Sequence, residues 1–588
     1  MTRMTTSKTY DNLNRLTDIS SQPTAQSLQP IASALSYNAA NQRTKNTLTD
    51  GSYWVYAYDS LGQVTNGCKY FPNGAPVPGQ QFDYAFDTIG NRTQTETGGD
   101  TNGLNLRVAN YHANSLNQLT NRDIPEYVDI MGASILTNTV TVNGQTAYRN
   151  QEYFRAQIPA NNTNSALWTN IIVSGGQSVT GHVYVAQQPE RFAYDADGNL
   201  TNDGRWSYTW DAENRLIGMT VNTNVGPQYQ LNFAYDPQGR RIQKLVTTGG
   251  VPTYTNNFLY DGWNLVAEIG PNNSLIRYYV WGTDLSGSAQ GAGGVGGLLE
   301  VSYHGAAATN AFVAYDGNGN VTALINAADG TLLANYDYGP FGEVIRATGP
   351  ARGTNPIRFS TKFQDDESDL LYYGYRYYKA STGTWPSRDP LGERGGMNLY
   401  MLVGNNAINS VDSFGLVRWG ELLKIGDGID SVVRLIPCCC SKPTGIHVTI
   451  HGVPTGTQVT ETANVTMYGC TDSIKILLYF WWDCGSAQRE AATDPSCPPP
   501  TTADPNPWHD YGWHLGSNPQ TQGELCTAWP VGPDPNDTRH WNWQSAVLFI
   551  ACKSGHYRAN LELSNAEEWT WSYWNHAWSD PHDGSGGK

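Results

Sequence analysis

Two short motifs in the stretch 388–416 combine residue types that can hydrolyse a peptide bond. The first is Arg388-Asp389-Pro390, and the second is Asp412-Ser413-Phe414-Gly415-Leu416. Neighbouring carboxyl groups can act as acid and base together, because like charges raise one pKa and leave that group protonated beside an ionised partner. Arg388 can keep one carboxylate ionised or orient a carbonyl. A structural alternative stays open, since Asp-Pro begins turns and Asp412 precedes a second turn signature.

Histidines are the other candidates for chemistry, and these lie near the C-terminus. Scattered His and Asp can bind a metal or serve as acid and base. No His-Glu-x-x-His, P-loop or Gly-x-Ser-x-Gly motif accompanies them, so we favour exposed loop histidines and predict no metal and no cofactor. The candidates are His509, Asp510, His514, His540, His556, His576 and His582.

The elements that must position the carboxylates are repeats of an aromatic-Asp pair, followed by Gly or Asn and then an apolar-Thr step. The aromatic residue ends an alternating strand, Asp opens a turn by accepting backbone N–H groups, and Gly or Asn supplies a positive φ. Each unit is predicted to be a β-hairpin, and neighbouring hairpins must stack because one alone is marginal. The copies are Tyr10-Asp11, Tyr58-Asp59, Phe86-Asp87, Tyr194-Asp195, Trp210-Asp211, Tyr235-Asp236, Tyr260-Asp261 and Tyr315-Asp316, with decayed copies at Tyr37-Asn38 and 114–120.

The composition indicates a turn-rich β protein with more than one structural unit. The 588 residues include 35 Tyr, 61 Gly and 31 Pro, and only 15% are charged. The net charge of −16 argues against a broad nucleic-acid-binding face. No run of about 18 apolar residues occurs, so no membrane span is predicted. Because Tyr10 already belongs to a repeat, we expect the chain to begin inside the array, with any export signal upstream.

These repeats resemble the YD repeats of RHS proteins, Tc toxin C components and teneurins. The resemblance implies a mainly β fold in which hairpins form one sheet that spirals into a hollow shell. Residues 359–416 resemble the RHS-associated core, which implies a plug that closes one end of the shell. The motifs that carry this second resemblance are Lys362–Asp366, Leu371–Tyr378, Gly383–Gly392, Gly396–Tyr400, Val403–Asn406 and Val411–Leu416.

In that family the core is also an intramolecular aspartic protease that cuts after the terminal Gly-Leu. Carried over, the scissile bond is Leu416–Val417, and Asp389 and Asp412 are the catalytic carboxylates. A tethered substrate has a high effective molarity, so a modest catalyst suffices for one turnover. Alternatively, Asp412 only shapes the loop that presents the bond. Ser413 stands where the family has Pro, and losing that fixed φ is expected to loosen the loop.

The patterns divide the chain into five segments. They are a YD-repeat shell at 1–120, an inserted β module at 121–190, further shell at 191–358, the core at 359–416 and an unrelated cargo-like domain at 417–588. Between Leu285 and Leu298 a Gly- and Ser-rich stretch is predicted to be a flexible loop.

The segment 417–588 is predicted to be a separate β or α+β domain supported by disulfides. Its 10 Lys and Arg against 18 Asp and Glu give a net charge of −8, which disfavours a nuclease. Residues 419–436 are compatible with a helix, and its many tryptophans form either a core, which we favour, or a carbohydrate-like binding face. Strands are predicted at 446–450, 464–468, 474–482 (or a short helix), 545–550 and 557–563.

The cysteines follow the same division of the chain. Only one, Cys68, precedes residue 417, and the other eight suggest an oxidising destination. A reduced or metal-binding cluster is the alternative. The eight are Cys438, Cys439, Cys440, Cys470, Cys484, Cys497, Cys526 and Cys552.

Two functions follow as hypotheses. In the first, a secreted or surface-displayed RHS-type shell encloses its own C-terminal domain as cargo, a polymorphic toxin, and releases it by cutting after Leu416. Regions upstream of this chain would contact a target cell or a secretion apparatus. In the second, the chain is a surface adhesion or structural YD shell with a C-terminal binding domain and no cleavage.

Overall fold

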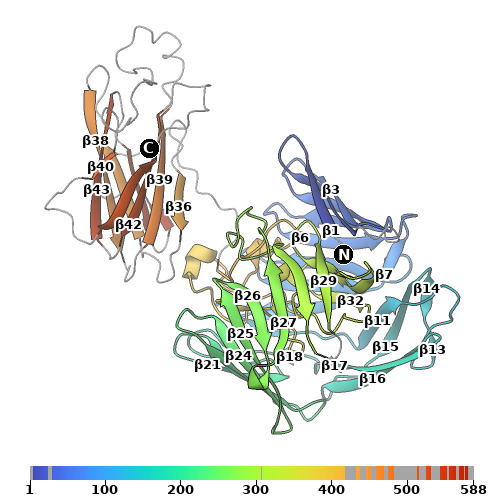
Figure 1. Cartoon of the computed structure of the whole chain (residues 1–588). Helices are drawn as coiled ribbons and strands as arrows, with labels where there is room; N and C mark the ends of the chain where they lie inside the picture. Colours follow the sequence, from blue (N-terminus) through green and yellow to red (C-terminus); the bar gives the residue numbers. More distant parts are fainter. Residues whose placement is uncertain are drawn as a thin grey trace. The chain divides into compact units, whose positions relative to one another are not determined.

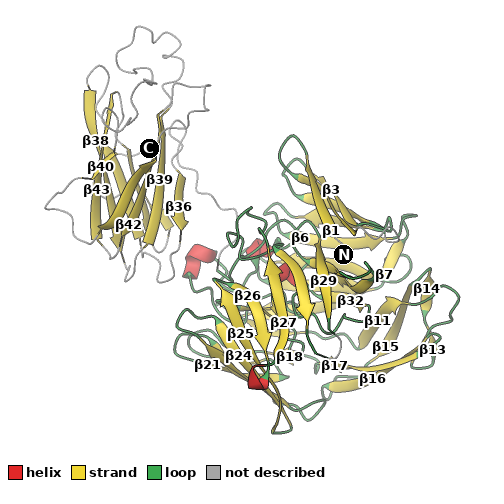
Figure 2. Cartoon of the chain, viewed as in Figure 1, coloured by secondary structure: helices red, strands yellow, loops and turns green. Residues whose placement is uncertain are grey.

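A computed structural model describes residues 4–23, 29–305 and 308–416, together with the backbone of the strands between Val432 and Ser579. The chain divides into two compact units, Met1–Trp419 and Gly420–Lys588. Strands and turns make up nearly all of the described residues, and helix is limited to short 3-10 turns (Figure 2). The prediction of a mainly β protein is therefore confirmed.

Two large antiparallel sheets dominate the first unit, and within each the strands pair largely in chain order (Figure 1). The 11-stranded sheet contains β1 (Met4–Tyr10), β2 (Leu16–Pro23), β3 (Ile31–Tyr37), β4 (Arg43–Leu48), β5 (Tyr53–Tyr58), β6 (Val64–Tyr70), β7 (Pro76–Phe86), β8 (Arg92–Gly98), β9 (Leu106–Ala113), β10 (Leu119–Arg122) and β18 (Glu190–Arg191). The 14-stranded sheet contains β19 (Ala193–Tyr194), β20 (Leu200–Asn202), β21 (Trp206–Trp210), β22 (Leu216–Val221), β23 (Tyr229–Tyr235), β24 (Arg241–Thr248), β25 (Val251–Asp261), β26 (Asn264–Ile269), β27 (Leu275–Trp281), β28 (Leu298–Tyr303), β29 (Thr309–Tyr315), β30 (Val321–Asn326), β31 (Leu332–Tyr338) and β32 (Val344–Thr348). The 3-10 turn η1 (Pro271–Asn273) connects β26 to β27.

The Asp of the repeat forms its turn as its chemistry predicts. Asp59 accepts the N–H groups of Leu61 and Gln63 through one carboxylate oxygen, both at 2.9 Å. Gly62 takes the positive φ of 82° that the turn requires. The amide of Gln63 then bonds the second carboxylate oxygen at 2.7 Å. The same backbone contacts form at Asn38 and Asn114, so the decayed copies fold like the others.

In many copies the Tyr of the repeat ties its hairpin to the one before it. Tyr235 donates its hydroxyl to the backbone carbonyl of Leu216, the first residue of the preceding return strand, at 2.6 Å. Tyr58 makes the same bond to Arg43 at 2.6 Å. Phe could fill the same space but could not make this bond, so the Tyr copies gain a link that a Phe copy lacks. Equivalent bonds link Tyr37 to Leu16, Tyr260 to Arg241, Tyr315 to Leu298 and Tyr338 to Val321.

One predicted copy departs from the pattern. The strand β25 continues through Asp261, which pairs with Asn264 across a two-residue turn. Gly262 supplies the positive φ of 55° there. Tyr260 keeps its bond to the preceding hairpin, so the aromatic half of the copy survives without the Asp turn.

Two smaller sheets interrupt the large ones between β10 and β18. One has the order β11 (Tyr127–Ala133), β15 (Tyr153–Pro159), β14 (Tyr148–Asn150). The other has the order β13 (Gln145–Thr146), β12 (Thr141–Val142), β16 (Leu167–Ser174), β17 (Ser178–Val185). They share a small apolar core that includes Val142, Phe154 and Ile171. The chain then returns to the first sheet, where β18 pairs with β10.

Residues 359–416 pack across the turns of both large sheets, and they contain little regular structure. Asn405 bonds the Gly90 carbonyl at 2.8 Å, and Tyr400 bonds the Gly198 carbonyl at 2.9 Å. Polar side chains of this segment thus replace solvent at the turn backbones. Its elements are η2 (Phe359–Thr361), β33 (Phe363–Gln364), β34 (Leu370–Tyr372), β35 (Tyr377–Lys379), η3 (Gly392–Gly395) and η4 (Val403–Asn405).

The second unit contains two sheets. One has the order β36 (Val432–Ile436), β39 (Ile474–Trp482), β42 (Trp543–Ala551), β41 (Leu525–Val531). The other has the order β40 (Trp513–Leu515), β43 (Gly555–Ser564), β38 (Gln458–Tyr468), β37 (Gly445–His451), β44 (Trp569–Trp574), β45 (Ala577–Ser579). The predicted strands fall within β37, β38, β39, β42 and β43. A helix continuing to Ile436 is wrong, because Val432–Ile436 pairs with β39 as a strand.

The predicted disulfides and histidine chemistry of this unit lie outside the described residues. His514 and His556 fall in strands whose backbone alone is described. Among the residues with described side chains, Cys68 is a free thiol, and its burial raises its pKa.

Candidate functional site

Asp389 and Asp412 meet at one buried guanidinium, that of Arg376. An Arg376 terminal nitrogen lies 2.7 Å from the Asp389 carboxylate and 3.6 Å from that of Asp412. All three side chains are almost fully buried. The two sequence-predicted carboxylates are therefore brought together by a residue that sequence analysis did not select.

The same guanidinium reaches the backbone next to the predicted scissile bond. Nε of Arg376 donates to the carbonyl oxygen of Gly415 at 2.5 Å. Asp389 and the Gly415-Leu416 step thus contact one planar group, which fixes their relative position. Leu416 is the last described residue here, and Val417 lies outside the described residues.

Asp412 organises the chain that follows it. One of its oxygens accepts the N–H groups of Phe414, Gly415 and Leu416 at 3.1, 2.7 and 3.0 Å. Three amides on one oxygen bend the chain into a tight loop, and Gly415 takes the φ of 78° that this loop needs. This geometry suits the alternative in which Asp412 shapes the loop that presents the bond.

The carbonyls of this loop are held from the other side. Lys362 donates to the Ser413 carbonyl at 2.7 Å, and the Tyr375 N–H donates to the Phe414 carbonyl at 3.0 Å. With Arg376 on Gly415, three successive carbonyls have protein donors. The loosening expected from Ser413 is therefore countered by contacts from neighbouring segments, and Ser413 is itself buried.

The Gly-rich stretch after Leu285, predicted to be a flexible loop, is instead packed against this site. Ala292 and Val295 are fully buried, and the Asp284 carboxylate bonds the N–H groups of Ala292 and Gly294 at 2.7 and 3.1 Å. A Cβ on Gly293 would overlap the Ser413 carbonyl. The glycines thus permit a close approach to the site. The prediction of a flexible loop failed because a high glycine content is typical of close packing as well as of flexibility.

Burial sets the electrostatics of the two cations. Burial lowers the pKa of Lys362 to about 8, against the opposing pull of Asp412 and Asp284. Burial also lowers the pKa of Arg376, although Asp389 and Asp412 favour its charged form. Because the local dielectric is low, a buried cation attracts a nearby carbonyl oxygen more strongly than the same cation would in water.

Arg388, the predicted cationic partner of the carboxylates, lies against a repeat turn. A Cβ on Gly198 would overlap its Nε, and this glycine sits in the Asp195 turn with a φ of 83°. Sequence reasoning chose Arg388 because it adjoins Asp389. The available signal for Arg376 was a charged residue in the aromatic run 371–378, where burial would demand partners.

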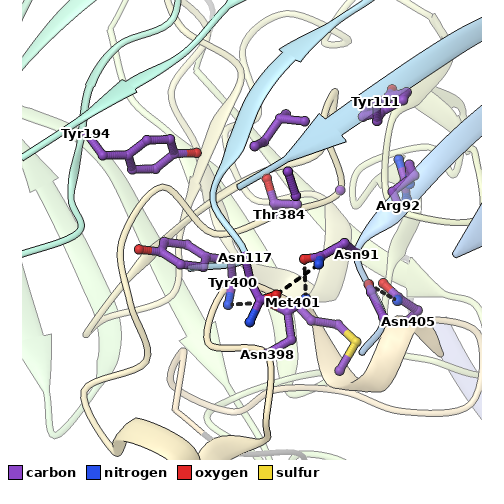
Figure 3. Close-up of a pocket in the computed structure, with 14 residues that line it drawn as sticks. Asn91, Arg92, Tyr111, Asn117, Tyr194, Thr384, Asn398, Tyr400, Met401 and Asn405 are labelled. Atoms are coloured by element: carbon purple, nitrogen blue, oxygen red, sulfur yellow. Dashed lines mark hydrogen bonds between the residues drawn. The ribbon is translucent and has the colours of Figure 1, made fainter. Parts of the chain in front are cut away.

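A small pocket lies where the core segment meets the turns of the first sheet (Figure 3). Asn91 links two neighbours there, accepting from Asn398 at 2.7 Å and donating to Asn117 at 2.9 Å (Figure 3). Its lining includes Arg92, Tyr111, Tyr194, Thr384, Tyr400, Met401 and Asn405. No carboxylate lines it, so it supports docking of the core and does not extend the carboxylate site.

No group of three or more metal-ligating side chains occurs in the part of the chain that the structure describes. The same residues include no helix that is long and apolar enough to cross a membrane.

Parts of this chain match known proteins. A family model described as the teneurin YD-shell matches residues 179–394, a range that includes Arg376 and Asp389 but ends before Asp412. The tRNA3(Ser)-specific nuclease WapA of Bacillus spizizenii is 26% identical over 235 residues, which is 39% of this chain and 9% of that protein.

Two toxins match shorter stretches at higher identity. Toxin subunit YenC2 of Yersinia entomophaga is 36% identical over 101 residues, 16% of this chain and 10% of that protein. Toxin protein Tse5 of Pseudomonas aeruginosa is 43% identical over 74 residues, 12% of this chain and 6% of that protein. The chain spans a tenth or less of the length of each of these three relatives.

The stacked hairpins and the segment packed on their turns define the class as a YD-repeat shell protein. Within that class, the chain is similar to RHS/YD-shell proteins, as its repeats predicted.

Proposed function

We propose that residues 1–416 form a toxin-type RHS shell that cuts its own chain after Leu416 and so separates residues 417–588. The observation that carries this proposal is the meeting of Asp389, Arg376 and the Gly415-Leu416 step. In this proposal 1–120 and 191–358 form the hollow wall, 121–190 is an insertion, and 359–416 is the plug. The segment 417–588 is the enclosed cargo.

The residues divide the work of hydrolysis as follows. Asp389, paired with Arg376, takes a proton from water as the water attacks the Leu416 carbonyl carbon. The C–N bond to Val417 then breaks, and the same proton passes to the departing amine. Asp412 and Arg376 hold the loop, so the bond is already ordered for attack. Arg388 packs against the Asp195 repeat turn.

The relatives support a toxin-like role for the whole protein. YenC2 is a toxin subunit and Tse5 is a toxin protein, and both match within a small part of their length. We infer a protein that acts outside the producing cell and contacts other toxin components through its shell.

Cleavage can be measured by intact mass of the purified full chain. The wild-type protein is expected to give two fragments that separate after Leu416, and Asp389→Asn is expected to leave one chain. Rate loss should be at least 100-fold, the usual scale for a general base. Asp197→Asn makes the same chemical change in an exposed repeat turn and should cleave like wild type.

A wild-type chain that stays intact through prolonged incubation at pH 5 to 8 would reject the proposal. That result would favour the second hypothesis, an adhesion or structural shell of the teneurin kind, which the match to the teneurin YD-shell also accommodates. Circular dichroism of Asp389→Asn would verify that the variant keeps its β-sheet content.

A further inference from the structure

We propose that Lys362 is a positioning residue that locks the loop Asp412–Leu416 in register by clamping it to the Gly-rich loop after Leu285. The catalytic role of this clamp rests on the proposed function, but the clamp itself can be tested without cleavage. The clamp makes the Gly-rich loop part of the candidate site.

The clamp consists of one ammonium group shared by two backbones. Nζ of Lys362 donates to the carbonyl of Ser413 at 2.7 Å and to the carbonyl of Gly293 at 2.8 Å. Lys362 is 6% exposed, so both bonds form away from bulk water. Charge-assisted bonds in such surroundings are stronger than neutral ones. The ammonium therefore joins two chain segments that are 120 residues apart in sequence.

The Gly-rich loop is rigid enough to serve as the fixed side of the clamp. Asp284 anchors it from within, as described above. Gln290 accepts the Trp263 N–H at 2.8 Å and donates to the Asp261 carbonyl at 2.7 Å, which ties the loop to the turn between β25 and β26. Trp263 in turn packs against Phe414, with ring centres 5.6 Å apart.

The opposite side of the clamp is the loop that carries the predicted bond. Ser413 lies between Asp412, whose oxygen accepts three amides, and Phe414, whose ring contacts Trp263. Proline would fix φ at this position by its own ring. Here an external ammonium supplies the constraint, so the substitution of Ser for Pro does not release the loop.

The first experiment measures hydrogen exchange in peptides that span 412–416. The full chain carrying Asp389→Asn is compared with the same chain carrying Lys362→Met as well. Loss of the clamp should speed exchange of the Phe414, Gly415 and Leu416 amides on the order of tenfold or more, with β26 and β29 unchanged. Equal exchange at 412–416 in the two chains would overturn the proposal, whether or not the wild type cleaves.

If Lys362→Met disturbs the whole unit, two glycine-to-alanine variants test the contact between the two loops instead. Gly293 and Gly287 both have positive φ, at 64° and 75°, so alanine strains the backbone similarly at each. Alanine at 293 would meet the Ser413 carbonyl, whereas nothing lies within 4 Å at 287. Gly293→Ala should loosen 412–416 and Gly287→Ala should not; the same protection in both would contradict the clamp.

The cleavage rate distinguishes a positioning role from simple space filling, because only a charged Lys362 that holds the loop would make the rate depend on pH in the alkaline range. Lys362 faces Asp412, Asp284 and Tyr373, and burial raises the pKa of that tyrosine. The wild-type rate should fall as pH rises above about 8, where the ammonium loses its proton. Lys362→Met should cleave at least tenfold more slowly at pH 7 and show no such fall. A variant that matches the wild-type rate at pH 7 would reject the positioning role.

Discussion

At the scale of single residues, buried cations hold the candidate site together. Arg376 faces two carboxylates and one carbonyl, and Lys362 faces two carbonyls. Each cation is expensive to bury unless its donors are used. Both are therefore expected to tolerate loss of their partners poorly, and Lys362 also affects the pH dependence of stability.

Lys362 should make the stability of the shell rise in mildly alkaline solution. Its pKa is lowered from 10.5 to about 8 in the folded chain, so the folded state gives up this proton first. Below pH 8 both states hold the proton, and burying the charge opposes folding in full. Between pH 8 and 10.5 the unfolded chain binds more protons, and stability rises with pH.

Urea unfolding of wild type and Lys362→Met at pH 7 and pH 10 isolates this contribution. The wild type should gain up to about 3 kcal/mol relative to the variant over that range. Taking the difference removes the shared tyrosine titrations. A difference that stays constant with pH would show that the ammonium is not destabilised by burial.

At the scale of elements, the hairpins are joined by side chains as well as by strand pairing. The hydroxyl of Tyr235 bonds the Leu216 carbonyl at 2.6 Å and the Tyr377 hydroxyl at 3.0 Å. It thereby links one hairpin to the hairpin before it and to the core segment. Such a bond lies at the end of a strand, where pairing weakens and the register shifts by one residue.

Removing that hydroxyl should destabilise the first unit. Tyr235→Phe leaves the Leu216 carbonyl without this donor in a buried place, at a cost of about 1–3 kcal/mol. Tyr10→Phe is the matched control, because Tyr10 occupies the same repeat position but is 53% exposed. Thermal unfolding should separate the two variants, and equal melting temperatures would contradict a role for the hydroxyl.

The repeats could be predicted from sequence because each copy contains its own turn chemistry. Asp59 and Gly62 determine a turn within four residues, and no distant contact is needed. The site could not be predicted in the same way. Arg376 was missed because the fold, and not the sequence, brings it next to Asp389 and Gly415. Arg388 was selected because it is the cationic neighbour of Asp389 in the sequence. The Gly-rich loop was misjudged because glycine permits close packing as well as flexibility.

At the scale of the whole first unit, buried ion pairs join the core segment to the repeats. Asp365 lies between Arg241 and Lys244 of β24, at 2.6 and 2.8 Å. Burial by itself raises the pKa of Asp365, but these two cations together hold it below its usual value. Asp365 therefore links the core segment to β24 through buried ion pairs, although the two segments are more than 100 residues apart in sequence.

Asp365→Ala should weaken the attachment of the core segment severely. The variant leaves Arg241 buried without its carboxylate, which typically costs about 3–5 kcal/mol. Asp366→Ala removes a neighbouring carboxylate that is 52% exposed, and it should cost under about 1 kcal/mol. Limited proteolysis of the core segment and urea unfolding would compare them; similar behaviour would show that Asp365 does not anchor the segment.

The span of these contacts has a consequence for the order of events on the ribosome. Arg43 bonds the Ile408 carbonyl at 2.8 Å, and Asn318 bonds the Ala407 carbonyl at 2.6 Å. Both partners of each bond exist only after almost the entire first unit has been synthesised. The hairpins can therefore assemble one after another during translation, while the carboxylates meet only at its end. Such a schedule means that scission after Leu416 can begin only once nearly all of the first unit has been synthesised and has folded.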